Sequence, residues 1–225
     1  MENIYLGRQP ILDIRENLDS YEILYSKADK ADSYAQNDFT PAIIISSVLN
    51  RFGTHQVLGN RRAFVKIGEK FLMNDLIFTI PNEFFIFSLL EDIEMSERVV
   101  ERMEQLKAKK YVLGIDEITI NSDLISKYKD VWKDFSFIKI NLHADFVNNN
   151  NTKALISAIK ARGIKVVGTK IEDGAKLERA KYLGCELFQG YFFSKPKIFE
   201  NTKYDPTRAN VLRLYSLLME DTNID

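Results

Sequence analysis

Short apolar runs separated by helical patterns are the feature that most constrains the fold of this 225-residue chain. The runs begin roughly 20 to 30 residues apart, the spacing of successive strand–helix units. They are AFVKI (63–67), FFIFSLL (84–90), YVLGID (111–116), FSFIKIN (135–141), IKVVGTK (164–170) and CELFQGYFF (185–193). Two of the segments between them, 96–110 and 151–163, carry apolar residues on one helical face. Near-continuous apolar strands that alternate with amphipathic helices indicate a parallel sheet covered by helices.

The two ends of the chain follow other patterns. The opening YLGRQPILDIRENLDSYEILYS contains two strand-like runs joined by a polar linker, which predicts an antiparallel hairpin before the strand–helix units. One hairpin followed by about six such units favours an α/β barrel, with an open doubly wound sheet as the alternative. KIFENTKYDP (197–206) is polar and turn-rich, and TRANVLRLYSLLMED then predicts an apolar-striped helix. We therefore expect a barrel over residues 1–203 and a C-terminal linker helix over 204–225.

Charge and composition exclude several classes of function. The chain has 31 basic and 32 acidic residues, so it lacks the general positive field that favours a nucleic acid polymer or an anionic membrane. Its N-terminus does not resemble a signal peptide, and no window approaches about 18 uninterrupted apolar residues. The single cysteine, Cys185, rules out an internal disulfide. These features predict a soluble cytoplasmic protein.

Polar residues finish most of the apolar runs. In barrels of parallel strands the chemistry lies at the carboxyl ends of the strands, so these residues are candidates for a common site, although each is also a normal start for a loop. An ammonium among carboxylates supplies positive charge that a metal ion would otherwise supply, so such a site can be neutral without metal. The candidates are Glu22, Lys66, Ser88, Glu91, Asp116, Glu117, Lys139, Asn141, Thr169, Glu172 and Gln189.

The same stretches carry a family resemblance. GRQPILD, SYEILYS and the closing ELFQGYFFSKP, with FVKIGEKFL, LLEDIE, GIDEI, FIKIN and VVGTKIED in order between them, resemble the EAL domain, the cyclic di-GMP phosphodiesterase family. The closest likeness is to the variant found ahead of an HDOD domain in bacterial signal transduction proteins. This resemblance implies a modified (β/α)8 TIM-type barrel whose first strand is antiparallel. In active members of the family, carboxylates and an asparagine at the strand ends hold two Mg²⁺ or Mn²⁺ ions that activate water for hydrolysis.

Compared with the family pattern, the chain resembles a degenerate member. Glu22, Asp116, Lys139 and Gln189 are kept, and Glu91 and Glu172 remain nearby. The phosphate-contacting arginine is replaced by Ser26 and the metal-binding asparagine by Lys66. Four further acids of the pattern are Ser88, Glu117, Asn141 and Thr169 here. These departures predict a pseudoenzyme with no catalytic residues, no bound metal and no cofactor.

The resulting interpretation is a catalytically inactive signalling domain that acts through a protein partner or self-association, with an HDOD domain following residue 225 in the whole protein. One alternative is a cyclic di-GMP receptor that binds without hydrolysis through Gln9, Lys139 and Gln189. Another is a metal-dependent phosphodiesterase with unusual ligands, namely Glu91, Glu117 and Glu172. A narrower hypothesis is that Lys66 forms an ion pair with Glu22 or Asp116 where a metal would bind; otherwise Lys66 extends to solvent.

Overall fold

The computed structural model describes residues 4–26, 38–118, 127–128, 131–142 and 149–201. The predicted helix over 204–225 lies outside these residues, so that prediction and the domain boundary remain untested. No helix within the described ranges is both long enough and apolar enough to cross a membrane.

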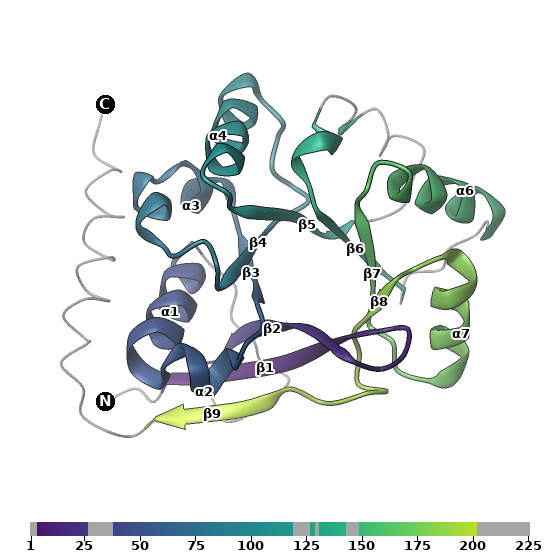
Figure 1. Ribbon diagram of the computed structural model, residues 1–225, viewed down its shortest axis with the longest axis horizontal. Coiled ribbons are helices and arrows are strands. Elements are labelled where there is room, and N and C mark those ends of the chain that lie inside the picture. Colours follow the sequence, from purple (N-terminus) through teal and green to yellow (C-terminus); the bar gives the residue numbers. More distant parts are fainter. Residues whose placement is uncertain (1–3, 27–37, 119–126, 129–130, 143–148, 202–225) are drawn as a thin grey trace.

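Eight strands close into a barrel (Figure 1). Strands β2 to β8 follow one another in parallel, and β1 closes the barrel because it pairs antiparallel with both β2 and β8. This confirms the predicted TIM-type barrel with an antiparallel first strand. The strands are β1 (Ile4–Asp13), β2 (Leu18–Ser26), β3 (Ala63–Ile67), β4 (Phe85–Leu89), β5 (Val112–Ile118), β6 (Phe137–Asn141), β7 (Lys165–Thr169) and β8 (Leu187–Phe188).

The predicted hairpin is formed by β1 and β2. Asp13 ends β1 and stabilises the turn, because its Oδ1 accepts hydrogen bonds from the backbone N–H groups of Arg15 and Asn17, each at 2.8 Å. Glu16 adopts φ 63° in this turn. The polar sequence between the two strands therefore reverses the chain.

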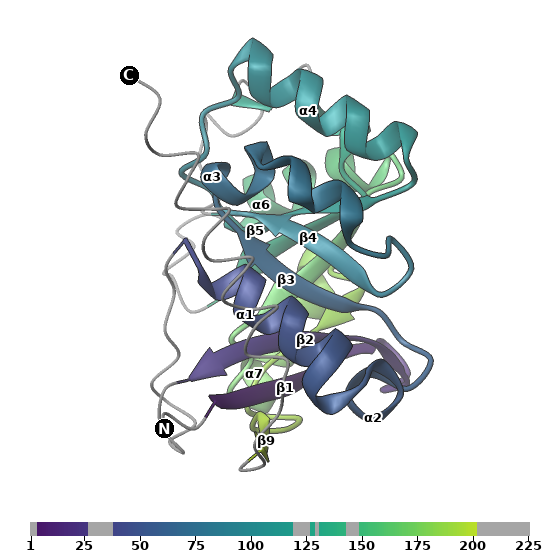
Figure 2. The ribbon, with the colours of Figure 1, turned by 90° about the vertical axis from the view of Figure 1, so that its left-hand side faces the viewer.

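Helices lie around the outside of the barrel (Figures 1 and 2). Ser96 caps α4, accepting from the Val99 N–H, and Asp173 caps α7, accepting from the Lys176 N–H. The helix α7 ends at Gly184, which adopts φ 96°. The α-helices are α1 (Thr40–Ser46), α2 (Thr54–Leu58), α3 (Glu69–Met73), α4 (Glu97–Ala108), α6 (Asn149–Lys160) and α7 (Gly174–Leu183). Shorter turns are the π-helix η1 (Ser47–Phe52) and the 3₁₀ helices η2 (Asp75–Thr79) and η3 (Trp132–Asp134).

The inside of the barrel is filled in two layers. Successive side chains on a strand alternate between its faces, so residues two apart point into the barrel at different heights. The lower layer is apolar and consists of Ile11, Phe64, Ile86, Val167 and Leu187, with Val112 and Phe137 packed against it. One step further along several strands toward their carboxyl ends, the inward positions become polar, as at Lys66, Lys139 and Gln189. We refer to these two sets as the apolar layer and the polar layer.

Two predictions about the C-terminal third are wrong. The run at 185–193 forms a strand only at Leu187–Phe188, because the chain then turns at Gly190, where a Cβ would lie 1.9 Å from the Ile171 carbonyl oxygen. Residues 197–201, expected to be part of a turn-rich segment, form strand β9 (Lys197–Asn201), which pairs antiparallel with the first half of β1. Phe199 on this strand is buried, and this burial stabilises the pairing of β9 with β1.

Candidate functional site

A cavity of about 710 Å³ opens at the carboxyl ends of the barrel strands. Its volume lies within the range of small-molecule binding sites, and its position is the one at which barrel enzymes carry their chemistry. Polar and apolar residues from most of the strand ends line it: Gln9, Glu22, Ile23, Leu24, Tyr25, Asp38, Thr40, Pro41, Ile44, Lys66, Gly68, Leu90, Glu117, Thr169, Lys170, Glu172, Gln189, Gly190, Tyr191 and Pro196.

The floor of the cavity is a buried ion-pair cluster. Lys139 on β6 is fully buried, and its Nζ lies 2.5 Å from Glu22 Oε1 and 3.4 Å from Asp116 Oδ1. The same ammonium lies 4.8 Å from the centre of the Phe64 ring, so it contacts the apolar layer below. Lys139 therefore belongs to the polar layer and contacts the apolar layer directly.

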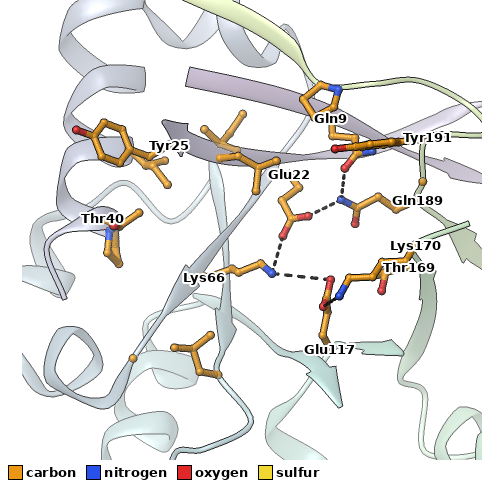
Figure 3. A pocket seen from close by; sticks show the side chains of 18 of the residues that line it. Gln9, Glu22, Tyr25, Thr40, Lys66, Glu117, Thr169, Lys170, Gln189 and Tyr191 are labelled. Carbon is orange, nitrogen blue, oxygen red and sulfur yellow. Dashed lines mark hydrogen bonds and ion pairs between the residues drawn. The ribbon is translucent and has the colours of Figure 1, made fainter. Parts of the chain in front are cut away.

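A second ammonium joins this cluster from above. Lys66 Nζ on β3 lies 2.8 Å from Asp116 Oδ2. It also lies 3.8 Å from Glu22 Oε1 and 3.9 Å from Glu117 Oε1 (Figure 3). The predicted ion pair of Lys66 is confirmed with both acids, and the alternative in which this side chain extends to solvent is excluded. The Lys66 side chain remains 22% exposed and lines the cavity, in contrast to Lys139.

A third ammonium lies at the rim. Lys170 directly follows β7, and its Nζ lies 3.0 Å from Glu117 Oε2. Glu117 and Lys170 have positive φ angles of 34° and 57°, a conformation that is uncommon for side-chain-bearing residues and occurs in turns and at functional sites. The cluster thus contains three carboxylates (Glu22, Asp116, Glu117) and three ammonium groups (Lys66, Lys139, Lys170), and its formal charge is zero.

The ion pairs shift the pKa values of two members. Burial alone would raise the pKa of Glu22, but the ammonium groups of Lys139 and Lys66 and the hydrogen bond from Gln189 lower it from 4.5 to about 2. Burial would lower the pKa of Lys66, but Glu22, Asp116 and Glu117 raise it above its ordinary value of 10.5. Both groups are therefore charged at neutral pH.

Two amides fix the position of Glu22. Gln189 donates through Nε2 to Glu22 Oε2 and to Gln9 Oε1, the latter at 2.9 Å. Gln9 in turn donates to the Ser194 carbonyl oxygen at 3.1 Å. Because both partners of Nε2 are acceptors, the orientation of the Gln189 amide is defined. Its Oε1 is buried without a hydrogen-bond partner.

The remaining candidates are placed differently from one another. Ser88 is buried and donates to Asp116 Oδ1 at 3.4 Å, and Thr169 donates to the Ile140 carbonyl oxygen at 3.2 Å. Glu172 lies on the cavity wall with its carboxylate paired to Lys176 of α7. Five of the predicted site residues do not line the cavity: Ser88, Glu91, Asp116, Lys139 and Asn141. Lys139 therefore cannot contact a ligand as predicted unless the cluster above it rearranges.

Sequence reasoning missed several residues that line the cavity, among them Lys170, Tyr25, Tyr191 and Thr40. Lys170 follows the strand-end residue Thr169, but the positive φ angle that accompanies its place at the rim has no sequence signal. Tyr191 presents an exposed aromatic ring to the cavity, whereas the buried ring of Tyr25 points away from Glu22 and Lys66 (Figure 3). Thr40 begins helix α1 beside the cavity. An aromatic residue at a strand end is the only signal that would have pointed to the tyrosines.

The described residues contain no group of three or more His, Cys, Asp or Glu side chains arranged to hold a metal ion. Instead, Glu22, Asp116 and Glu117 all approach the Lys66 ammonium within 4 Å. Oxygen ligands for a hard divalent ion are thus present, but a side-chain cation lies among them.

Comparison with known proteins places this geometry in a family. The model of the EAL domain matches residues 60–196, more than half of the chain. YuxH of Bacillus subtilis, an uncharacterised protein, is 29% identical over 204 residues, which cover 87% of this chain and 48% of YuxH. The cyclic di-GMP phosphodiesterase CdgJ of Vibrio cholerae is 25% identical over 224 residues, covering 96% of this chain and 49% of CdgJ. The chain spans about half the length of these curated relatives.

Solved structures with EAL domains share the fold. The Bacillus subtilis YkuI protein, in complex with cyclic di-GMP and calcium, superposes with a TM-score of 0.68 at 14% identity, covering 96% of this chain and 61% of YkuI. The EAL enzyme Bd1971, bound to cAMP and cyclic di-GMP, gives a TM-score of 0.67 at 17% identity, covering 96% of this chain and 64% of Bd1971. At these identities the likeness establishes the barrel and not the ligand.

These findings correct two predictions. The prediction that the chain is not an enzyme is contradicted by the match to the EAL domain and by similarity to a cyclic di-GMP phosphodiesterase and an EAL enzyme. The prediction of no cofactor is contradicted because an EAL neighbour holds its ligand together with calcium, which points to use of a divalent metal. The HDOD association and the protein partner remain predictions. On the evidence of its barrel and of the family match over residues 60–196, the chain belongs to the EAL domain family.

Proposed function

We propose that this chain binds cyclic di-GMP in the cavity at the strand ends and that a divalent cation takes part in binding. The observation that carries the proposal is a cavity of about 710 Å³ whose wall combines accessible ammonium groups, carboxylates and an exposed aromatic ring. Membership of the EAL domain family and similarity to CdgJ support the choice of ligand.

The cavity wall suits the chemistry of a cyclic dinucleotide. Such a ligand carries two phosphates and two purine bases. Lys66 and Lys170, whose side chains are 22% and 46% exposed, are the ammonium groups on the wall that phosphate oxygens can reach. The exposed ring of Tyr191 supplies a flat apolar surface for a base.

Charge balance is the reason for including a cation. The six charged groups of the cluster already neutralise one another, so a ligand with two negative charges has no unpaired positive charge to meet. A divalent ion that enters with the ligand restores a net charge of zero, because its two positive charges match the two phosphates. We therefore expect cyclic di-GMP and the metal to strengthen the binding of each other.

A phosphodiesterase activity is the second candidate. The observation that favours it is the grouping of the Glu22, Asp116 and Glu117 carboxylates at the cavity, together with similarity to a protein named as a cyclic di-GMP phosphodiesterase. A divalent ion bound at such carboxylates would supply an activated water for attack on phosphorus. Hydrogen bonds from Gln189 to Glu22 and from Ser88 to Asp116 fix the positions of these two carboxylates.

The direct test is calorimetry of the 225-residue chain with cyclic di-GMP, with and without Mn²⁺. We expect heat of binding that is larger, with a lower Kd, when Mn²⁺ is present. Absence of heat at high micromolar protein under both conditions would contradict the proposal. Chromatography of the same mixtures separates the two candidates, because linear dinucleotide appears only if the chain hydrolyses the ligand.

Two lysines at opposite ends of β7, Lys165 in its first position and Lys170 directly after it, provide a matched test of the binding site. Lys170→Gln removes an ammonium at the rim and is expected to weaken cyclic di-GMP binding about 5- to 20-fold, the effect of losing one charge-assisted contact. Lys165→Gln, at the opposite end of β7, removes the same charge from a lysine that pairs with Asp19. It is expected to leave Kd within about twofold, and an equal loss in both variants would show a general charge effect.

A further inference from the structure

Three carboxylates from two strands converge on a single side-chain nitrogen. Asp116, Glu22 and Glu117 place an oxygen 2.8, 3.8 and 3.9 Å from Lys66 Nζ. Carboxylate oxygens are also the ligands that a hard divalent ion prefers, but at about 2.0–2.6 Å, so these three would have to move closer around such an ion than they lie around the ammonium. The ammonium of Lys66 and a divalent ion therefore compete for the same oxygens.

Lys66 is the member of this group that is free to leave. Its side chain lines the cavity and is 22% exposed, so the ammonium can move into solvent along the cavity wall. The carboxylates have other partners that hold them when it leaves. Glu22 keeps Lys139 and Gln189, Asp116 keeps Lys139 and Ser88, and Glu117 keeps Lys170.

A buried oxygen beside the cluster points independently to a missing ligand. Gln189 is only 4% exposed, and its Oε1 has no hydrogen-bond partner although its Nε2 is committed to Glu22 and Gln9. Figure 3 shows this amide reaching over the cavity toward Glu22. A neutral amide oxygen next to carboxylates is a suitable additional ligand for a divalent ion, directly or through water.

We propose that Lys66 is a tethered cation that a divalent metal must displace from Glu22, Asp116 and Glu117, and that this displacement sets the metal affinity of the site. With Lys66 in place the cluster has no net charge to attract a further cation, and the Lys66 ammonium occupies the position between the three carboxylates. Without its ammonium the remaining three carboxylates and two lysines have a net charge of −1, which attracts one. The inference rests on the proposed function for the presence of a divalent cation and deepens it, and it is tested with the metal alone.

The test is a titration with Mn²⁺ in the absence of nucleotide, followed by electron paramagnetic resonance of the free ion. Lys66→Met is expected to bind Mn²⁺ at least 10-fold more tightly than the wild-type chain. Lys170→Met is the matched control, since it removes one ammonium from the same cluster but not from the point where the three carboxylates converge. Its Mn²⁺ affinity is expected to change less than threefold. No gain in Lys66→Met, or an equal gain in both variants, would overturn the proposal.

A measurement on the wild-type chain covers the case in which Lys66→Met does not fold. Acetylation of lysines by a water-soluble reagent, read by mass spectrometry, reports the exposure of each ammonium. Saturating Mg²⁺ is expected to increase the labelling of Lys66 severalfold and to leave Lys165 unchanged. Unchanged labelling of Lys66 at an Mg²⁺ concentration that saturates the site would contradict displacement, whatever the outcome of the cyclic di-GMP titrations.

Discussion

The apolar and polar layers of the barrel interior lie one inward step apart on the same strands, yet they have opposite chemistry. On β3, Phe64 belongs to the apolar layer and Lys66 to the polar layer, and on β6 the corresponding pair is Phe137 and Lys139. The lower layer is stabilised by packing, whereas the upper layer depends on complete pairing of its charges. The comparison teaches that a shift of two residues along a strand separates the apolar layer, which stabilises the barrel, from the polar layer, which can respond to a ligand.

The largest effect is expected from a cavity in the apolar layer. Phe64 is fully buried, and its ring contacts the Phe137 ring at a centroid distance of 5.2 Å. Phe64→Ala should lower the free energy of unfolding by about 3–5 kcal/mol, measured by urea denaturation. Phe64→Leu is the control and should cost less than about 1.5 kcal/mol, because it conserves most of the volume. Equal losses would mean that the ring contact with Lys139, and not packing, dominates this layer.

A slightly smaller loss is expected from breaking the polar layer. Lys139→Met leaves Glu22 and Asp116 without their buried partner and should cost about 3 kcal/mol, at the low end for such pairs because Lys66 still lies within 4 Å of both acids. The urea midpoint of the variant measures the loss. The double variant Glu22→Gln/Lys139→Met should regain part of it, because it removes one uncompensated charge. A double variant less stable than Lys139→Met would contradict this account.

The smallest of the three effects concerns pH. Because the pKa of Glu22 is lowered from 4.5 to about 2 in the folded state, its stabilising contribution is complete above pH 4.5 and is lost as the pH falls toward 2. The loss should amount to about 2–3 kcal/mol. Thermal unfolding between pH 7 and 2 measures it, and Glu22→Gln should show a shallower acid decline. Lys66, whose pKa is raised, should contribute fully up to about pH 10.5 and lose its contribution only above that value.

Much of the barrel was predictable because its strands are apolar on both faces. The expected runs at 63–67 and 164–170 correspond to β3 and β7 within one residue at each end. Closure of the barrel by β1 against β8 was not readable from the chain, since this pairing joins residues about 175 positions apart. The short β8 was overestimated because the aromatic run after Phe188 has the composition of a strand, although Gly190 makes the backbone turn against Ile171.

The sequence predicted which residues meet at the candidate site, but not how deeply each one is buried. Residues that finish parallel strands do meet at one end of the barrel, and Lys66 lies with Glu22 and Asp116 as expected. Sequence alone could not tell that Lys139 lies below the cavity floor, because depth depends on strand register and tilt. The inference from missing ligands to absence of activity is contradicted by the match to the EAL domain and by similarity to a cyclic di-GMP phosphodiesterase, because the identity of single strand-end residues does not fix the activity of the whole site.

Strand β9 has a consequence for engineering. Ile4 pairs with Asn201, and Tyr5 on the same strand pairs with Ser26 at the carboxyl end of β2, so the described chain enters and leaves the barrel at the end that carries the cavity. A fluorescent reporter joined directly before Ile4 or directly after Asn201 would therefore begin close to the rim. Such fusions offer a biosensor geometry in which occupancy of the cavity changes the surroundings of the reporter without a linker that spans the barrel.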